Sequence, residues 1–189
     1  MRISGSFARM RSVIRCQRPC QAHSGGLRGA RDAIANRGVD EIPSLLQTLH
    51  QRADTYRIKL GIVVALTEML RKTPSAAAEI EPLLTDPDLE LLISLAGDSD
   101  RTVRIYATEF LYDLNSPRVT RLALSRVDDE ASIDAKYNWL FLSQGGWRLL
   151  AEDERETLFT PLENAWSQVG ANNPKTRAFI EQYHPSAQR

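Results

Sequence analysis

The sequence predicts an all-α fold from about residue 40 to the C-terminus, and three observations predict it. Apolar residues recur at helical spacing through this region. Helix-capping residues stand at nearly every expected helix start. Strand signals are missing, because no segment alternates apolar and polar residues for long and no Asn-Gly or Asp-Gly hairpin turn occurs. We therefore expect helices with short links, which favour antiparallel neighbours.

The first two expected helices show the apolar spacing clearly. After Asp40, an apolar set at i, i+3, i+4 and i+7 begins with Ile42 and ends with Leu49. The next helix follows Asp54 as its cap and is apolar nearly all round, with Leu60 on the face opposite its main stripe. We expect this second helix to be the most buried element.

Four helix starts share one device, a capping residue followed by proline. The cap accepts a hydrogen bond from a free amide, and proline needs no N–H at the first position. These starts are Thr73-Pro74, Asp86-Pro87, Ser116-Pro117 and Asn173-Pro174. The expected helices span residues 41–52, 55–72, 74–84, 87–96, 101–114, 117–126, 132–144, 152–168 and 174–183.

Self-comparison of the chain indicates a repeat. Asp86-Pro87 and Ser116-Pro117 lie thirty residues apart, and the same offset aligns the apolar residues that follow them. An offset of forty-five residues aligns the helix expected at 101–114 with the earlier helix expected at 55–72. This alignment pairs Lys59 with Arg104.

The stretch from Asp86 to Leu114 resembles a HEAT repeat. Its pattern is Asp98-Ser99-Asp100 in the turn, Val103-Arg104 at the start of the second helix, and then Ala107, Leu111 and Leu114. The resemblance implies that Asp98 or Asp100 and Arg104 bridge adjacent units. It also implies a short α-solenoid of about three to four antiparallel helix pairs over residues 39–189. The neighbouring units are diverged, since Asp134 stands at the Arg position of the next one.

Residues 1–38 differ from the rest of the chain in charge. Residues 1–37 contain eight arginines, no lysine and a single acid, Asp32, which leaves 16 basic and 23 acidic residues for 38–189. A glycine-containing segment without apolar periodicity predicts disorder. An Arg-rich, acid-poor composition is also typical of a mitochondrial transit peptide, and an over-extended start site would look the same. We expect a cytoplasmic protein, or a matrix protein if the segment targets mitochondria.

The two cysteines, Cys16 and Cys20, both lie in this segment, so the helical region has no disulfide framework. With His23 they offer three metal ligands, but no fourth ligand is near and the spacing matches no zinc-finger pattern. We expect no metal and no cofactor.

Arginines of the repeat are the first candidate for a partner-binding surface. Arg104, Arg118 and Arg121 form a basic ridge if their side chains share a face, and such a ridge suits an acidic peptide or phosphate. The alternative is an ordinary solvated face in which these arginines pair with nearby aspartates such as Asp113 and Asp128.

Tryptophans of the C-terminal third are the second candidate. This third holds eight of the thirteen aromatic residues, among them Trp139 and Trp147. An exposed Trp139 would suit a binding hot spot. The alternative is that these rings pack against one another at the end of the repeat.

These features predict a non-catalytic scaffold or adaptor that binds another protein or peptide on the concave face of the repeat. The sequence has no His-Glu-x-x-His, nucleophile elbow or phosphate-binding loop, and we expect no small-molecule substrate. Two other classes stay open. The Arg-rich segment could tether the protein to nucleic acid or an anionic membrane. The second open class is a HEAT-like DNA glycosylase, although the acidic region 38–189 would repel a DNA duplex.

Overall fold

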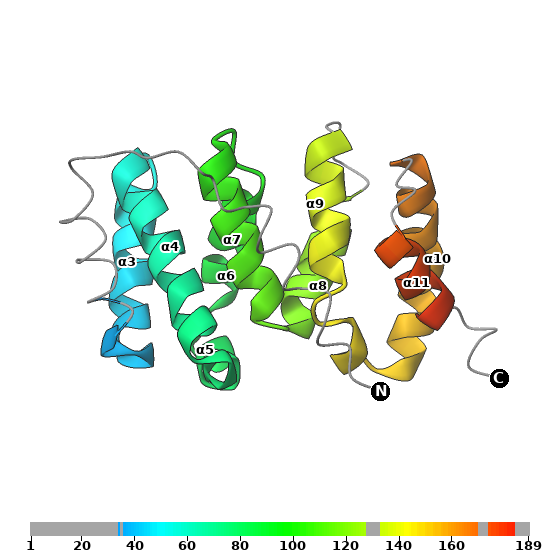
Figure 1. Cartoon of the computed structure of the whole chain (residues 1–189), viewed down its shortest axis with the longest axis horizontal. Coiled ribbons are helices and arrows are strands. Elements are labelled where there is room, and N and C mark those ends of the chain that lie inside the picture. Colours follow the sequence, from blue (N-terminus) through cyan, green and yellow to red (C-terminus); the bar gives the residue numbers. More distant parts are fainter. Residues whose placement is uncertain (1–33, 35, 128–132, 170–173, 184–189) are drawn as a thin grey trace. The chain divides into compact units, whose positions relative to one another are not determined.

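All of the described structure is helical. The computed structural model describes residue 34 and residues 36–127, 133–169 and 174–183. Within these ranges it contains nine α-helices and no strand (Figure 1). The all-α prediction is confirmed for this part of the chain. None of the described helices is long and apolar enough to cross a membrane.

The helices follow one another along the chain with short links. The α-helices are α3 (Ile42–Arg52), α4 (Tyr56–Lys72), α5 (Ala77–Ile80), α6 (Asp86–Ala96), α7 (Arg101–Asp113), α8 (Pro117–Ser125), α9 (Ile133–Ser143), α10 (Glu152–Gln168) and α11 (Pro174–Tyr183). Short 3-10 helices are η1 (Val39–Glu41), η2 (Pro74–Ala76), η3 (Glu81–Leu83) and η4 (Trp147–Leu149). Eight of the nine predicted ranges agree with these bounds to within one residue at each end.

The predicted helix at 74–84 is wrong. The α-helix there is only α5, with η2 before it and η3 after it. Pro82 has no N–H to donate to the carbonyl one turn back, which favours a break in the helix at this position. Proline alone does not decide this, since α10 continues through Pro161. The segment is broken into three short helical pieces.

Side-chain caps begin three of the long helices. Asp100 accepts hydrogen bonds from the first free amides of α7, and Ser116 does the same for α8. At α6 the cap is Thr85, which forms a reciprocal capping box with Asp88. The prediction that Asp86 caps this helix is wrong, since Asp86 is its first helical residue.

The remaining predicted caps differ in outcome. Asp40 lies inside η1, and Thr73 makes no side-chain hydrogen bond to η2. Thr55, rather than Asp54, precedes the first residue of α4, and it also makes no such bond. Asn173 lies outside the described residues.

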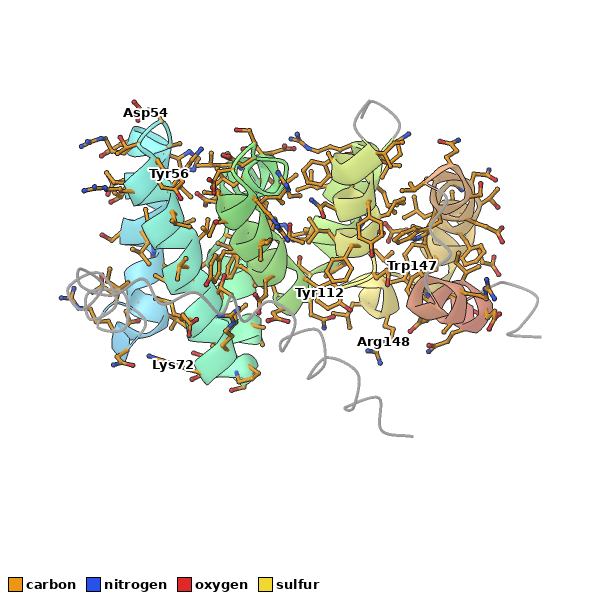
Figure 2. The ribbon with its side chains drawn as sticks, turned by 45° about the horizontal axis from the view of Figure 1, so that its top comes forward. Asp54, Tyr56, Lys72, Tyr112, Trp147 and Arg148 are labelled. Atoms are coloured by element: carbon orange, nitrogen blue, oxygen red, sulfur yellow. The ribbon has the colours of Figure 1, made fainter. Side chains whose placement is uncertain are left out.

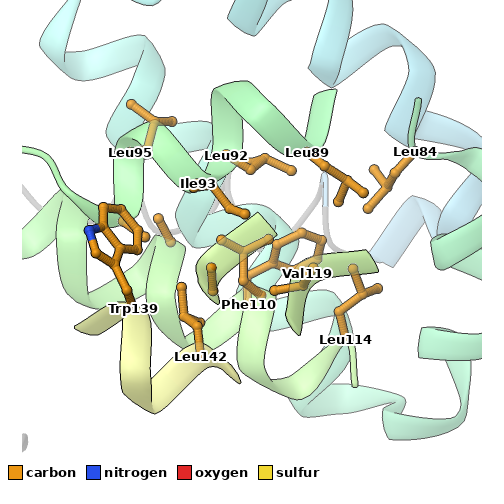
Figure 3. Close-up of a cluster of buried hydrophobic side chains, with 14 of the residues drawn as sticks. Leu84, Leu89, Leu92, Ile93, Leu95, Phe110, Leu114, Val119, Trp139 and Leu142 are labelled. Carbon is orange, nitrogen blue, oxygen red and sulfur yellow. The ribbon is translucent and has the colours of Figure 1, made fainter. Parts of the chain in front are cut away.

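One hydrophobic core extends from α3 to α10. Figure 3 shows its middle, where Leu89 and Leu92 of α6 meet Phe110 of α7, with Val119 of α8 and Leu142 of α9 beside them. In α4 the run from residue 62 to residue 67 is buried throughout, so this helix is covered on nearly all sides, as predicted. The core is thus shared among helices that are distant in the sequence.

Helix contacts follow two series. Helices α3, α6 and α8 contact one another in that order, and so do α4, α7 and α9. Each member of the first series also contacts one member of the second, in the pairs α3 with α4, α6 with α7, and α8 with α9. Helix α10 contacts α9.

Helices α4 and α7 lie side by side and run in the same direction. Three polar contacts join α4 to α7 or to the turn before it, each between residues 38 or 39 apart. They are Lys59 Nζ to Asp98 Oδ2 at 2.5 Å, Thr67 Oγ1 to Tyr106 O at 3.0 Å, and Arg71 Nη2 to Glu109 Oε2 at 2.5 Å. Because these contacts advance together along both segments, the register of the two helices is fixed along their length.

The link between α9 and η4 packs closely against the start of α8. A Cβ atom at Gly146 would lie 2.2 Å from the carbonyl oxygen of Ser116. Beside this contact, Thr120 Oγ1 donates to the carbonyl oxygen of Ser143 at 3.2 Å. The position therefore requires glycine for space.

Gly146→Ala is expected to lower the free energy of unfolding by about 1–3 kcal/mol, because overpacking forces the backbone apart. Gly61, exposed in α4 with nothing within 4 Å of its Cβ position, provides the control. Gly61→Ala should raise stability by up to about 1 kcal/mol, since alanine is the better helix former. Urea denaturation measures both, and equal effects of the two substitutions would contradict the close contact.

Asp98 gives a pH-dependent prediction. Burial raises its pKa, but hydrogen bonds from Lys59 and the Asp100 N–H, with the charges of Lys59 and Arg104, lower it below the ordinary value. The unfolded chain therefore binds this proton at higher pH than the folded chain. The contribution to stability is complete above the ordinary aspartate pKa of about 4 and is lost as pH falls through the folded value.

We expect the free energy of unfolding of the wild type to fall more steeply on acidification below about pH 5 than that of Asp98→Asn. Asp40→Asn, at an exposed position of η1, serves as the control and should retain the wild-type slope. Urea titrations at several pH values measure the slopes. Identical slopes for all three proteins would rule out the Asp98 contribution.

Candidate functional site

Arg118, a predicted partner-binding residue, lies at the start of α8 and is engaged within the molecule. Its guanidinium donates to Leu84 O at 2.9 Å and to Asp86 Oδ1 at 2.5 Å, with Glu81 Oε1 at 3.5 Å. The hydrogen bond from Arg118 to Asp86 is the main cause of a raised Arg118 pKa. Arg118 thus ties α8 to the segment between α5 and α6.

Arg121, the second predicted arginine, forms a two-point ion pair with Glu154 of α10. Its Nε and Nη2 atoms lie 2.5 and 2.8 Å from the two carboxylate oxygens. This hydrogen bonding lowers the pKa of Glu154. The pair is partly exposed, so it adds little stability, but it is a direct link between α8 and α10.

Arg104, the third, folds back on the turn before its own helix. Its Nη1 donates to the carbonyl oxygen of Asp98 at 2.6 Å. The Asp98 carboxylate receives Lys59 from α4, so a single turn links α4, α6 and α7. These contacts fix the turn rather than leave a free guanidinium.

The predicted basic ridge is therefore replaced by links between helices. The expected local partners of these arginines also differ from those observed, since the carboxylates are Glu81, Asp86 and Glu154. Arg126 repeats the pattern with Glu90 of α6. Each of these pairs joins residues 32 to 37 apart in the sequence, so each links two different elements of the fold. Asp128, an expected partner, lies outside the described residues.

Trp139 is buried, with 3% of its surface exposed. Its indole points from α9 toward α6 (Figure 3), and a Cβ at Gly97 would lie 2.9 Å from the ring. The absence of a side chain at Gly97 makes room for this ring. Trp139 is therefore not exposed, as a binding hot spot would require. Helical spacing alone does not show how far the ring reaches across the neighbouring helix.

Trp147 is fully buried at the centre of an aromatic cluster. Its ring centroid lies 6.4 Å from Phe159 of α10, 5.8 Å from Phe179 and 6.5 Å from Tyr183, the last two on α11. The structure thus agrees with the alternative that these rings pack against one another. Trp147 is not available to a surface partner.

One half-buried tyrosine was not among the site residues that the sequence predicts. Tyr112 of α7 stacks on Phe141 of α9 with ring centroids 4.5 Å apart. Burial raises the pKa of Tyr112, and the negative charge of Asp113 adds to the rise. The sequence gives only an indirect signal, since the repeat offset of thirty residues aligns Phe141 with Leu111, the residue before Tyr112.

No group of three or more metal-ligating side chains occurs among the residues that the structure describes. Cys16, Cys20 and His23 lie outside them. Comparisons with protein-family models, with curated proteins and with solved structures find no match for this chain. The functional argument therefore depends on the chain's own geometry.

Trp139→Ala is expected to lower the free energy of unfolding by about 3–5 kcal/mol, because a large buried ring leaves a cavity. Arg121→Ala is the matched surface control and should cost less than about 1 kcal/mol. Urea denaturation followed by circular dichroism measures both. A small effect at Trp139 would mean that its ring is not packed in the core.

Proposed function

We propose that this chain is a non-catalytic scaffold that binds another protein through a short stack of HEAT-like antiparallel helix pairs. The observation that carries the proposal is the double series of contacts, α3–α6–α8 and α4–α7–α9, with one contact between the series in each pair. Stacked helix pairs produce this pattern, since each pair touches its neighbours only. Such arrays usually serve as binding surfaces.

The polar contacts between pairs support a true repeat. Lys59 holds the position that aligns with Arg104, and its ammonium binds Asp98 in the turn of the following pair. A HEAT-like array would use the turn aspartate and the basic residue of the second helix in this way. The next contact of that kind would involve Asp128, outside the described residues.

The partner surface that we propose is the exposed side of α4, α7 and α9. Arg118 and Arg121 of α8 are occupied by internal ion pairs, so α8 has fewer free groups for a partner. Helices α7 and α9 instead carry the half-buried aromatic residues Tyr106, Tyr112 and Phe141. Tyrosine is one of the residue types that are enriched among the side chains that dominate protein–protein affinity.

Site-specific photocrosslinking in full-length protein tests this proposal. A photoreactive amino acid replaces Gly61 of α4 or Ile105 of α7, and Gln47 of α3 or Ser94 of α6 in the controls. Gly61 is exposed with open space at its Cβ position, and Ile105 is half-buried on the helix surface. We expect one protein to be cross-linked from Gly61 and Ile105 and not from the controls. Equal labelling from all four positions, or labelling from α3 and α6 alone, contradicts the assigned face.

The charge of residues 1–37 favours a second function, tethering to nucleic acid or an anionic membrane. Eight arginines against one acid give this segment a net charge near +7, and phosphate binding through arginine weakens steeply with added salt. A protein-binding scaffold and a tether to nucleic acid or membrane differ in how strongly their binding depends on salt. Binding to a protein through the helices should survive salt that removes a nucleic acid or vesicle from the segment.

A further inference from the structure

Helix α10 is attached to the rest of the molecule on fewer sides than the helices before it. Helix α7 packs against α4, α6 and α9. In the part of the chain that the structure describes, the main helix contact of α10 is with α9 alone. Because each unit of a helical array gains stability from its neighbours, a helix with one main neighbour gains less than a helix with three.

Two polar contacts of α10 with the preceding helices lie at the surface. Arg121 of α8 pairs with Glu154, and the arginine side chain is 48% exposed. Lys136 Nζ of α9 lies 3.5 Å from Gln168 Oε1, also at an exposed position. Exposed contacts of this kind contribute little to stability, because water competes for the same groups.

The contacts between α4 and α7, nearer the other end of the described helices, are less exposed. Arg71 binds both carboxylate oxygens of Glu109, and these side chains are 28% and 20% exposed. Thr67 is fully buried and donates to the carbonyl oxygen of Tyr106. Partial burial strengthens such contacts. Helix α4 is therefore held more firmly than α10.

The sequence of α10 also supports its helix less well than the sequences of α6, α7 and α8 do. Ala151 precedes α10 and offers no side-chain cap, whereas each of the other three helices has one. Pro161 lies inside α10 and removes one backbone hydrogen bond. Acidic residues in the first turn offset part of this loss. Helix α10 thus depends on packing for its stability.

That packing is centred on one ring, which α10 and α11 share. Trp147 contacts Phe159 of α10 and Phe179 and Tyr183 of α11, with ring centroids 5.8 to 6.5 Å apart. Figure 2 labels Trp147 between α9 and these last two helices. Because both helices pack on the same side chain, movement of one removes part of the support of the other. The two helices are therefore coupled.

Two buried indole N–H groups oppose this packing. Trp147 is fully buried, and Trp166 of α10, which packs edge-on against Tyr137 of α9, is 3% exposed. Neither indole Nε1 has a hydrogen-bond partner among the described residues. A buried donor without an acceptor is unfavourable, and water supplies the acceptor once the ring is exposed. Separation of α10 from α9 and η4 relieves this penalty.

The link between η4 and α10 provides a hinge. The backbone of Leu150 and Ala151 is extended, with ψ of 149° and 153°. Ala151 is exposed, whereas Leu150 is buried. Before η4 the chain is fixed by the close contact of Gly146 with the carbonyl oxygen of Ser116. A rotation at Ala151 can therefore move α10 without disturbing η4.

We propose that α10 and α11 open together at Ala151 while α3 to α9 stay folded, and that this opening exposes Trp147 and Trp166 to solvent. The structure described here is the closed state. Opening as a unit is expected because parts of a protein that share one packing surface unfold cooperatively, at a lower free energy than the whole. The proposal does not depend on the scaffold function.

Native-state hydrogen exchange of the full-length protein tests the opening. Mass spectrometry of peptic peptides compares the amides of α10 with those of α4 and α7, each relative to the rate of an unstructured peptide. We expect the most protected amides of α10 to exchange at least about tenfold faster than the most protected amides of α4 and α7. Equal protection of the three helices would overturn the proposal.

Two conservative core substitutions, one on each side of the hinge, separate local opening from global unfolding. Ile93 of α6 is fully buried and keeps its packing in the open state. Ile93→Val should therefore speed exchange in α4 and α7 by about two- to tenfold and leave exchange in α10 unchanged. Phe159→Leu weakens a contact that opening breaks, so it should speed exchange in α10 by at least about threefold.

Two results with these variants would overturn the proposal. Acceleration of α10 by Ile93→Val, by the same factor as α4 and α7, would mean that the helices unfold as one unit. Unchanged exchange of α10 in Phe159→Leu would mean that opening does not separate Phe159 from Trp147. If Phe159→Leu does not fold, Arg121→Ala replaces it and should speed exchange in α10 by up to about fivefold.

Discussion

Burial of apolar side chains between successive helices is the constraint on which the rest of this structure depends. Phe110 of α7 is fully buried, and the side chains around it come from α6, α8 and α9 as well as from its own helix. No two helices enclose such a core by themselves. The core therefore holds only while neighbouring helices stay in register, and each helix gains stability from the next.

Polar contacts between helices reinforce the same register. Lys59, Thr67 and Arg71 of α4 each reach a residue of α7 or of the turn before it. Arg118 and Arg121 do the same for α8. Bonds of this kind contribute little individually at the surface, but they oppose sliding of one helix along another. They also explain why these arginines are poor candidates for partner binding.

The C-terminal part of the described structure is held in a different way. Aromatic rings replace aliphatic side chains, and Trp147 joins η4 to α10 and α11. Edge-to-face contacts of this type add to the energy of burial and restrict ring orientation.

The sequence by itself determined where the helices begin and end. Ser116 and Asp100 accept hydrogen bonds from backbone amides two or three residues away, and helical spacing is also a local pattern. Both signals can therefore be recognised without knowing the fold. Residues 74–84 show the limit, since the sequence predicts one helix there and the structure has three short helical pieces. The contacts of Trp139 and Arg121 were decided only by the tertiary structure. Their partners, Gly97 and Glu154, lie on other helices, and which residues meet depends on how those helices pack.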